Sequence, residues 1–230
     1  MMNGFRRVCI AGVTMGLAAA CAASAQDTVP PTTAFGRQMA RVDFGVSGKG
    51  EFTRNTSGTT YLPQNVNLVP SNTFGALVTL RYTVSPYVGF EGNYGYARYT
   101  DNFTSNNVTG TPNGATQFVL GVQTNVSEYT LGYVAHVPHT LFGAHPFAGV
   151  GAGSLAFRPT NGGGQGFKPQ ARAAYYYNAG VEAPVYKERF GLRLSFRQVF
   201  YLAPDYETNY LTNKQRTIAT EPNFGFYLHF

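Results

Sequence analysis

The chain has 230 residues, with 17 lysines and arginines against 11 acidic residues and a formal net charge of +6 at pH 7. This mild basic excess does not indicate a nucleic-acid-binding protein. Aromatic residues make up 15% of the chain, and only 12% of the residues are charged. Beyond residue 25 no apolar run reaches about 18 residues, which excludes a membrane-spanning helix in that part of the sequence.

Residues 1–25 have the layout of a cleaved bacterial secretory signal. Arg6 and Arg7 precede an apolar run, and an Ala-Ser-Ala stretch ending at Ala25 forms the cleavage site. We therefore expect the mature chain to begin after Ala25. Both cysteines fall inside the signal, so the mature chain has no thiol for disulfides, metal binding or nucleophilic catalysis. Lipidation at Cys21 stays open as an alternative.

Residues 26–39 are expected to form a flexible periplasmic lead-in, and residues 40–230 a single barrel domain. From residue 40 onward no stretch keeps helical periodicity, whereas apolar and polar residues alternate with a period of two. In the stretch FGALVTLRYTV, for example, Leu80 shares a face with other apolar residues and Arg81 lies on the opposite face. The sequence therefore predicts an all-β fold.

Eight strands are expected, each about 9 to 13 residues long, whereas strands of soluble domains are commonly nearer 5 or 6. A tilted strand that crosses a bilayer needs about 9 to 11 residues. The expected strands are 40–52, 74–84, 87–99, 127–137, 146–157, 173–185, 190–202 and a last one ending with 223–230. The strand from Pro146 to Phe157 is almost entirely small or apolar, so its facing stays open.

Short and long connections alternate between these strands. The short ones are residues 85–86, 138–146 and 186–189, and the long polar ones are 53–73, 100–116, 158–172 and 203–217. Strict alternation is typical of outer-membrane barrels, with short periplasmic turns and long outer loops. A bilayer offers no hydrogen-bond partners to the backbone, so such a sheet must close on itself. A soluble lipocalin-like barrel with its apolar faces inward is the alternative.

The chain ends in NFGFYLHF, with phenylalanine or leucine at every second position. Asn223, Gly225, Leu228 and the terminal Phe230 resemble the C-terminal signal of outer-membrane barrels. Together with the strand layout from about residue 41 onward, they make the chain similar to the small eight-stranded OmpA/OmpX-like barrel family. The resemblance implies an eight-stranded antiparallel up-and-down transmembrane β-barrel, with the barrel-assembly machinery as a partner during insertion.

The charged residues on the polar strand faces are expected to point into this barrel. Side chains just fill an eight-stranded barrel, and buried charges must pair. Lys49 and Glu51 belong to the inward charges. The predicted lumen network consists of Arg41, Asp43, Arg81, Glu91, Glu128, Glu182, Arg193 and Arg197. A narrow gated pore, in which pairs such as Glu128–Arg193 exchange partners, is the alternative.

The four histidines lie near strand ends that the topology directs toward the periplasm. They are His136, His139, His145 and His229. Their spacing is not a known ligand pattern, so we expect no metal site and no cofactor. Enzymes that modify lipid A need reactive groups at the outer leaflet, and the usual general bases stand at the opposite end here. We therefore predict no catalytic residues and no enzyme, with a lipid A-modifying enzyme as the third hypothesis.

The expected outer loops are basic. Their basic residues are Arg54, Arg158, Lys168, Arg172, Lys214 and Arg216, with Arg98 near the outer interface. Such groups pair with phosphates, so outer-membrane lipids and lipopolysaccharide are the expected partners, and ordinary solvated charges are the alternative. We expect a monomeric protein of the bacterial outer membrane, with four outer loops, a polar interior and a structural or surface-interaction role that involves no nucleic acid.

Overall fold

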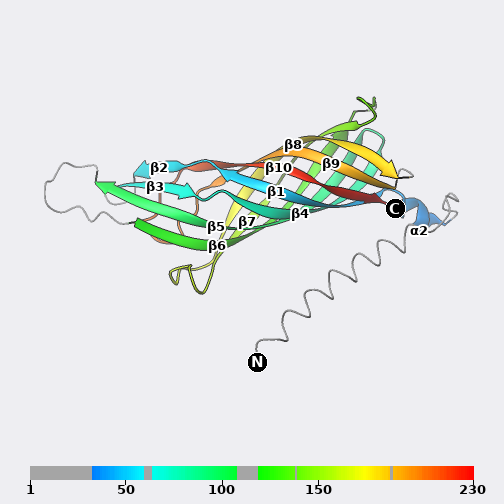
Figure 1. Ribbon diagram of the computed structural model, residues 1–230. Helices are drawn as coiled ribbons and strands as arrows, with labels where there is room; N and C mark the ends of the chain where they lie inside the picture. The colour runs from blue at the N-terminus through cyan, green and yellow to red at the C-terminus, as the bar shows by residue number, and fades with distance from the viewer. Residues whose placement is uncertain (1–32, 60–63, 108–118, 138, 187–188) are drawn as a thin grey trace. The chain divides into compact units, whose positions relative to one another are not determined.

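The computed structural model describes residues 33–59, 64–107, 119–137, 139–186 and 189–230 (Figure 1). The chain divides into two units, residues 1–40 and 41–230. The predicted secretory signal, its cleavage after Ala25 and the alternative lipidation of Cys21 lie outside the described residues. No helix in the described ranges is long and apolar enough to cross a bilayer.

In the first unit, Ala34–Met39 form a short helix, α2, within the segment that was expected to be a flexible lead-in. Thr33 caps this helix, because its side-chain oxygen accepts a hydrogen bond of 3.1 Å from the backbone N–H of Gly36. Arg37, in the last turn, suits the negative end of the helix dipole. The lead-in is therefore partly ordered by its own local sequence.

The second unit is built from strands. They are β1 (Val42–Thr53), β2 (Thr56–Thr59), β3 (Gln64–Pro70), β4 (Thr73–Ser85), β5 (Val88–Asn107), β6 (Val119–His136), β7 (His145–Pro159), β8 (Gln170–Tyr186), β9 (Phe190–Leu202) and β10 (Arg216–His229).

Eight of these strands close into an antiparallel barrel. Their order is β5-β4-β1-β10-β9-β8-β7-β6, and β5 also pairs with β6. Each barrel strand thus pairs with the strands before and after it, and β1 pairs with β10 to close the wall. Closure removes the free edges at which strands of other chains would add. The predicted eight-stranded up-and-down barrel is confirmed.

The short hairpin of β2 and β3 extends the sheet beyond the barrel and was not predicted. Strand β3 pairs with the far end of β5, from Asp101 to Asn107 (Figure 1). Val66 and Leu68 in this hairpin are buried, although asparagines surround them in the sequence. The expected loops 53–73 and 100–116 are therefore wrong in part, because the neighbouring strands are longer than the apolar alternation alone indicates.

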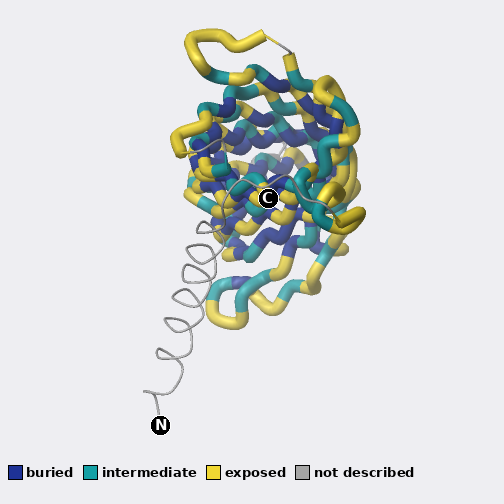
Figure 2. The backbone as a smooth tube through the Cα atoms, turned by 90° about the vertical axis from the view of Figure 1, so that its right-hand side faces the viewer, coloured by how far each residue is buried: buried dark blue, intermediate teal, exposed yellow. Residues whose placement is uncertain are grey.

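Along each barrel strand, buried and exposed residues alternate (Figure 2). On β4, Leu80 keeps 55% of its surface exposed, whereas the adjacent Arg81 keeps only 1%. The apolar face thus points outward and the charged face inward, which is the reverse of a soluble barrel. The same alternation settles the facing of β7, where Phe147 and Phe157 are buried and Val150 is exposed.

The outward apolar side chains form a band around the barrel, which we call the apolar belt. It consists of Phe44, Val46, Phe74, Leu80, Phe90, Tyr94, Tyr96, Tyr129, Leu131, Tyr133, Val150, Tyr175, Tyr177, Leu194, Phe196, Phe224 and Phe226. A continuous apolar surface of this kind exceeds what soluble monomers expose. Such a surface fits a lipid environment.

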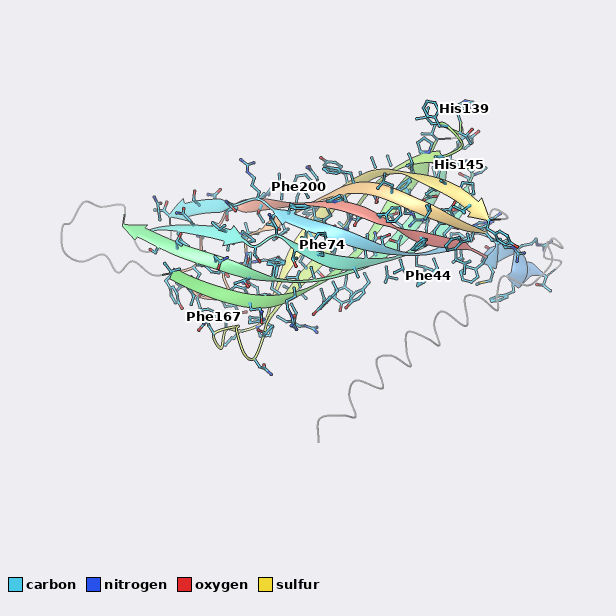
Figure 3. All side chains as sticks on the ribbon, in the orientation of Figure 1. Phe44, Phe74, His139, His145, Phe167 and Phe200 are labelled. Carbon is cyan, nitrogen blue, oxygen red and sulfur yellow. The ribbon has the colours of Figure 1, made fainter. Side chains whose placement is uncertain are left out.

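The barrel has two different ends. At the turn end lie the connection of residues 86–87, residues 139–144 between β6 and β7, and the adjacent ends of β8 and β9. At the loop end lie β2 and β3, the last residues of β5, the first residues of β6 and the connections of residues 160–169 and 203–215. Figure 3 places Phe44 toward the turn end and Phe74 nearer the loop end. The positions of the interior side chains are given relative to these two ends of the barrel.

Candidate functional site

The interior nearer the turn end holds a network that we call the Arg81 cluster: Arg81, Glu91, Glu182, Arg193 and Tyr176. The two Nη atoms of Arg81 donate to Glu182 at 2.5 Å and to Glu91 at 3.0 Å. Arg193 Nε donates to the same Glu182 oxygen at 2.9 Å, and the Tyr176 hydroxyl donates to Glu91 at 2.9 Å. Two guanidinium groups thus face two carboxylates, so the charges of the four ionised side chains balance.

A second network, the Arg197 cluster, lies nearer the middle of the barrel and consists of Lys49, Glu51, Glu128, Arg197 and Glu221. Lys49 Nζ lies 2.5 Å from Glu221, 3.2 Å from Glu51 and 3.7 Å from Glu128. Arg197 Nη1 donates to Glu128 at 2.8 Å and to Glu221 at 3.0 Å. Two cations here face three carboxylates, so carboxylates outnumber cations in this cluster.

Both clusters are assembled from strands that are far apart in the sequence. In the Arg197 cluster, Lys49 comes from β1, Glu128 from β6 and Glu221 from β10. All five members are at least nine-tenths buried. The guanidinium of Arg197 also lies 4.1 Å from the centroid of the Tyr176 ring, a cation–π distance that connects the two clusters. The charged interior is thus one continuous network of paired groups.

The structure places seven of the eight predicted lumen residues inside the barrel. They are Asp43, Arg81, Glu91, Glu128, Glu182, Arg193 and Arg197. Arg41 is exposed and precedes β1, so its inclusion in the predicted network is wrong. The alternation that places Asp43 inward begins only with the strand. The suggested Glu128–Arg193 pair is also wrong, because Glu128 contacts Arg197.

Sequence reasoning missed Glu221 as a member of the interior. Its carboxylate accepts hydrogen bonds from both Lys49 and Arg197, so it is central to the cluster. The available signal was the two-residue period of the last strand, which places Glu221 on the same face as the buried Asn223. If the two-residue alternation of β10 is continued from Asn223 back past Pro222, Glu221 falls on the inward face.

The predicted clustering of histidines at one end is visible for two of them in Figure 3, where His139 and His145 lie at the turn between β6 and β7. His136 lies 3.1 Å from Arg81 Nη1, and His229 Nδ1 lies 2.5 Å from Asp43. Within the described ranges, no three histidine, aspartate or glutamate side chains are arranged to hold a metal ion. Two of the histidines thus extend the charged network to the turn end.

Near the loop end the interior also contains an apolar cluster, beside buried polar residues such as Asp101 and Thr124, which corrects the expectation of a polar interior throughout. The connection of residues 203–215 folds into the barrel mouth, where Ala203, Tyr206 and Leu211 are buried. The Tyr206 ring stacks on Phe167 at 5.8 Å and meets Phe103 edge-on at 6.2 Å. Aromatic packing therefore closes the mouth, and we call this apolar group around Tyr206 the cap.

One carboxylate, Asp101, lies under the cap and beyond the apolar belt, which ends on β5 at Tyr96. The Tyr206 hydroxyl contacts both Asp101 Oδ2 and the Thr124 hydroxyl, the latter at 2.8 Å. Burial raises the pKa of Asp101 to about 7, the hydrogen bond from Tyr206 opposes this rise, and the charge of Glu51 adds to it. The cap is therefore held over a group that titrates near neutral pH.

The pH dependence of stability follows from this raised pKa. Between the unfolded value near 4 and the folded value of about 7, the folded state binds the proton more tightly, so stability rises as pH falls through this window. Asp101→Asn is expected to flatten that rise, measured as the urea midpoint at about pH 5 and about pH 8. Asp205→Asn is the control, because its pKa is lowered and it titrates below this window. An unchanged slope in Asp101→Asn contradicts the assignment.

The basic residues of the predicted loops have different surroundings. Arg172 donates from Nη2 to Asp205 at 2.8 Å, so it fixes the 203–215 connection to β8. The others are exposed: Arg54, Arg98, Arg158, Lys168, Lys214 and Arg216. The ion pair with Asp205 thus gives Arg172 a structural role, whereas the exposed basic residues remain available to other molecules.

The predicted assembly-signal residues all lie on or next to β10, the strand that closes the barrel against β1. Asn223 is buried, and its side-chain nitrogen donates to the Glu221 carbonyl at 2.8 Å. Gly225 pairs with Ser47, and Leu228 pairs with Phe44. The terminal Phe230 is exposed. Asn223, Gly225 and Leu228 therefore lie in the closing seam, and recognition of this strand by the assembly machinery stays a prediction.

Neither a protein-family model nor a curated protein sequence matches the chain. Among solved structures, the chain is similar to the outer membrane protein OprG from Pseudomonas aeruginosa, with a TM-score of 0.53 and 12% identity over 82% of this chain and 95% of OprG. Neisserial surface protein A matches with a TM-score of 0.48 and 15% identity, covering 81% of this chain and 97% of that one. At these identities the likeness to OprG concerns the fold alone.

Proposed function

We propose that this chain, which has the fold of the small eight-stranded outer-membrane β-barrels, resides in a bacterial outer membrane as a closed barrel with a structural or surface-interaction role. The apolar belt supports residence in a bilayer, since it would be costly to expose to water. By analogy with such barrels, the loop end faces outward and the turn end faces the periplasm.

The filled interior is the observation that carries this proposal. Paired charges occupy the middle of the barrel, and the apolar cap closes the loop end. Moving an ion through these groups would separate buried charge pairs in a medium of low dielectric constant, which is costly. A closed barrel leaves its outer loops as the part that contacts other molecules.

Heat-modifiable migration on a gel tests the membrane assignment. We expect the protein in purified outer-membrane fractions to migrate anomalously until it is boiled, because a closed, fully hydrogen-bonded sheet resists detergent at room temperature. A protein found in the soluble periplasmic fraction without a boiling shift would contradict the proposal.

Conductance in planar bilayers tests the closed interior. We expect no resolved current steps, because both charged clusters and the cap would have to rearrange to admit ions. Reproducible steps would favour the narrow-pore alternative, and Arg197→Ala should then alter their size. A change in the lipid A mass profile that depends on the protein would instead favour the lipid-modifying alternative.

A further inference from the structure

Two arginines and an asparagine form a short row across three neighbouring strands on the outer surface. Arg98 on β5 pairs with Asn125 on β6, and Asn125 pairs with Arg158 on β7. Both arginines are exposed. Neighbouring strands lie about 4.8 Å apart, so the two arginine Cα atoms are roughly 10 Å apart with the amide between them.

The row is held in place by hydrogen bonds. Arg98 Nε donates to Asn125 Oδ1 at 2.6 Å, and the Tyr96 hydroxyl donates to the same oxygen at 3.0 Å. The Thr73 hydroxyl donates to the Arg98 carbonyl at 2.8 Å, which also fixes the backbone there. Because the contact with Asn125 engages Nε, the two Nη groups of Arg98 are the donors that could serve a further acceptor.

The row also marks the upper border of the apolar belt. Below it on β5, Tyr94 and Tyr96 belong to the belt. Above it on β5, the outward residues Thr100 and Asn102 are polar, and on β6 the Thr160 hydroxyl of the 160–169 connection donates to the Gln123 side chain at 3.0 Å. In an outer membrane this border is the level of the lipid headgroups, where aromatic and basic side chains gather.

No acidic side chain balances these two arginines on their own face. The acidic residues of β5, β6 and β7 are Glu91, Asp101 and Glu128, and all three are buried in the interior. Among the ion pairs of the described ranges, none includes Arg98 or Arg158. The two guanidinium groups therefore add positive charge to one surface, and an anion bound between them would be attracted by both.

We propose that Arg98 and Arg158 form a binding site for the phosphate of an outer-leaflet lipid headgroup. Guanidinium groups bind phosphate oxygens through paired, charge-assisted hydrogen bonds, and the anchored Arg98 loses less conformational freedom on binding. The lipid chains lie along the apolar belt below the row. This inference rests on the proposed membrane residence, and it names one specific lipid contact within it.

Native mass spectrometry of the protein purified in a neutral detergent tests the site. We expect the protein to bind lipid A about tenfold more tightly than dephosphorylated lipid A, because only the former offers phosphate oxygens. The double variant Arg98→Gln, Arg158→Gln is expected to lose that preference while it still binds the dephosphorylated lipid. Equal binding of the two lipids by the unmodified protein would overturn the proposal.

The matched control is the double variant Arg54→Gln, Arg216→Gln. Arg54 follows β1 directly and Arg216 begins β10, and both are exposed at the loop end. This double variant changes the net charge by the same amount as the first one. We expect this control to keep the preference to within about twofold, since surface charges elsewhere are screened. If both double variants lost the preference for lipid A equally, the preference would come from the overall positive charge of the protein, and the proposed site would be overturned. The boiling shift, recorded for every variant, separates failure of the site from failure of membrane residence.

Discussion

Arg197→Ala is expected to destabilise the barrel by about 3–5 kcal/mol, because it leaves buried carboxylates without their partner. Arg197 contacts both Glu128 and Glu221, and its guanidinium stacks over Tyr176. Once it is removed, Lys49 alone faces three buried carboxylates in the cluster. The measurement is urea-induced unfolding in lipid vesicles, followed by the fraction that keeps the folded gel mobility.

Two further variants make this test specific. Arg216→Ala removes an exposed arginine of the same barrel and is expected to change stability by no more than about 0.5 kcal/mol. Adding Glu221→Gln to Arg197→Ala removes one of the unbalanced charges and should recover part of the loss. A loss below about 1 kcal/mol in Arg197→Ala would show that the cluster is more hydrated than its burial implies.

Gly225→Ala is expected to cost about 3 kcal/mol or more, or to prevent closure, because no space exists for its methyl group. A Cβ at this position would lie 2.1 Å from the Val46 carbonyl oxygen and 2.4 Å from the Ser47 Cα. Both are backbone atoms of β1, so the closing seam itself would have to open. The yield of heat-modifiable protein after refolding into lipid vesicles measures the effect.

The neighbouring position of the same seam supplies the control. Gly48 pairs with Phe224 on β10, and a Cβ there would meet only the Phe224 carbonyl oxygen at 3.9 Å. Gly48→Ala is therefore expected to refold normally. Because refolding in vitro needs no assembly machinery, a Gly225→Ala defect seen only in cells would assign Gly225 to recognition and contradict the packing explanation.

The facing of the strands was predictable because it depends only on a local period of two. Leu80 and Arg81 are adjacent in the sequence, and the pleat of a strand must send them to opposite faces. The same period of two continues into segments that were expected to be loops, where Val66 and Leu68 are buried. Sparse apolar residues among asparagines give a weak signal, whereas burial against Phe103 gives those residues their stability.

The partners of the interior charges were not predictable from the same pattern. Alternation places Glu128 and Arg193 inside the barrel. It does not indicate which strands lie opposite each other across the barrel, or how far along the barrel axis each side chain lies. The structure pairs Glu128 with Arg197 and Arg193 with Glu182. Register and stagger set these partners, and both are properties of the closed sheet. Arg41 was misplaced for a related reason, because alternation applies only where the chain is in the strand.

The sequence by itself determined the class of fold and which residues share a face on most strands, because each follows from residues close together in the chain, whereas the structure decided that the apolar faces point outward and how β7 faces. Tertiary structure alone decided the pairing of charges, the folding of residues 203–215 into the barrel mouth and the alignment of Arg98, Asn125 and Arg158. These features join residues from different strands, and only closure of the sheet brings such residues within contact distance.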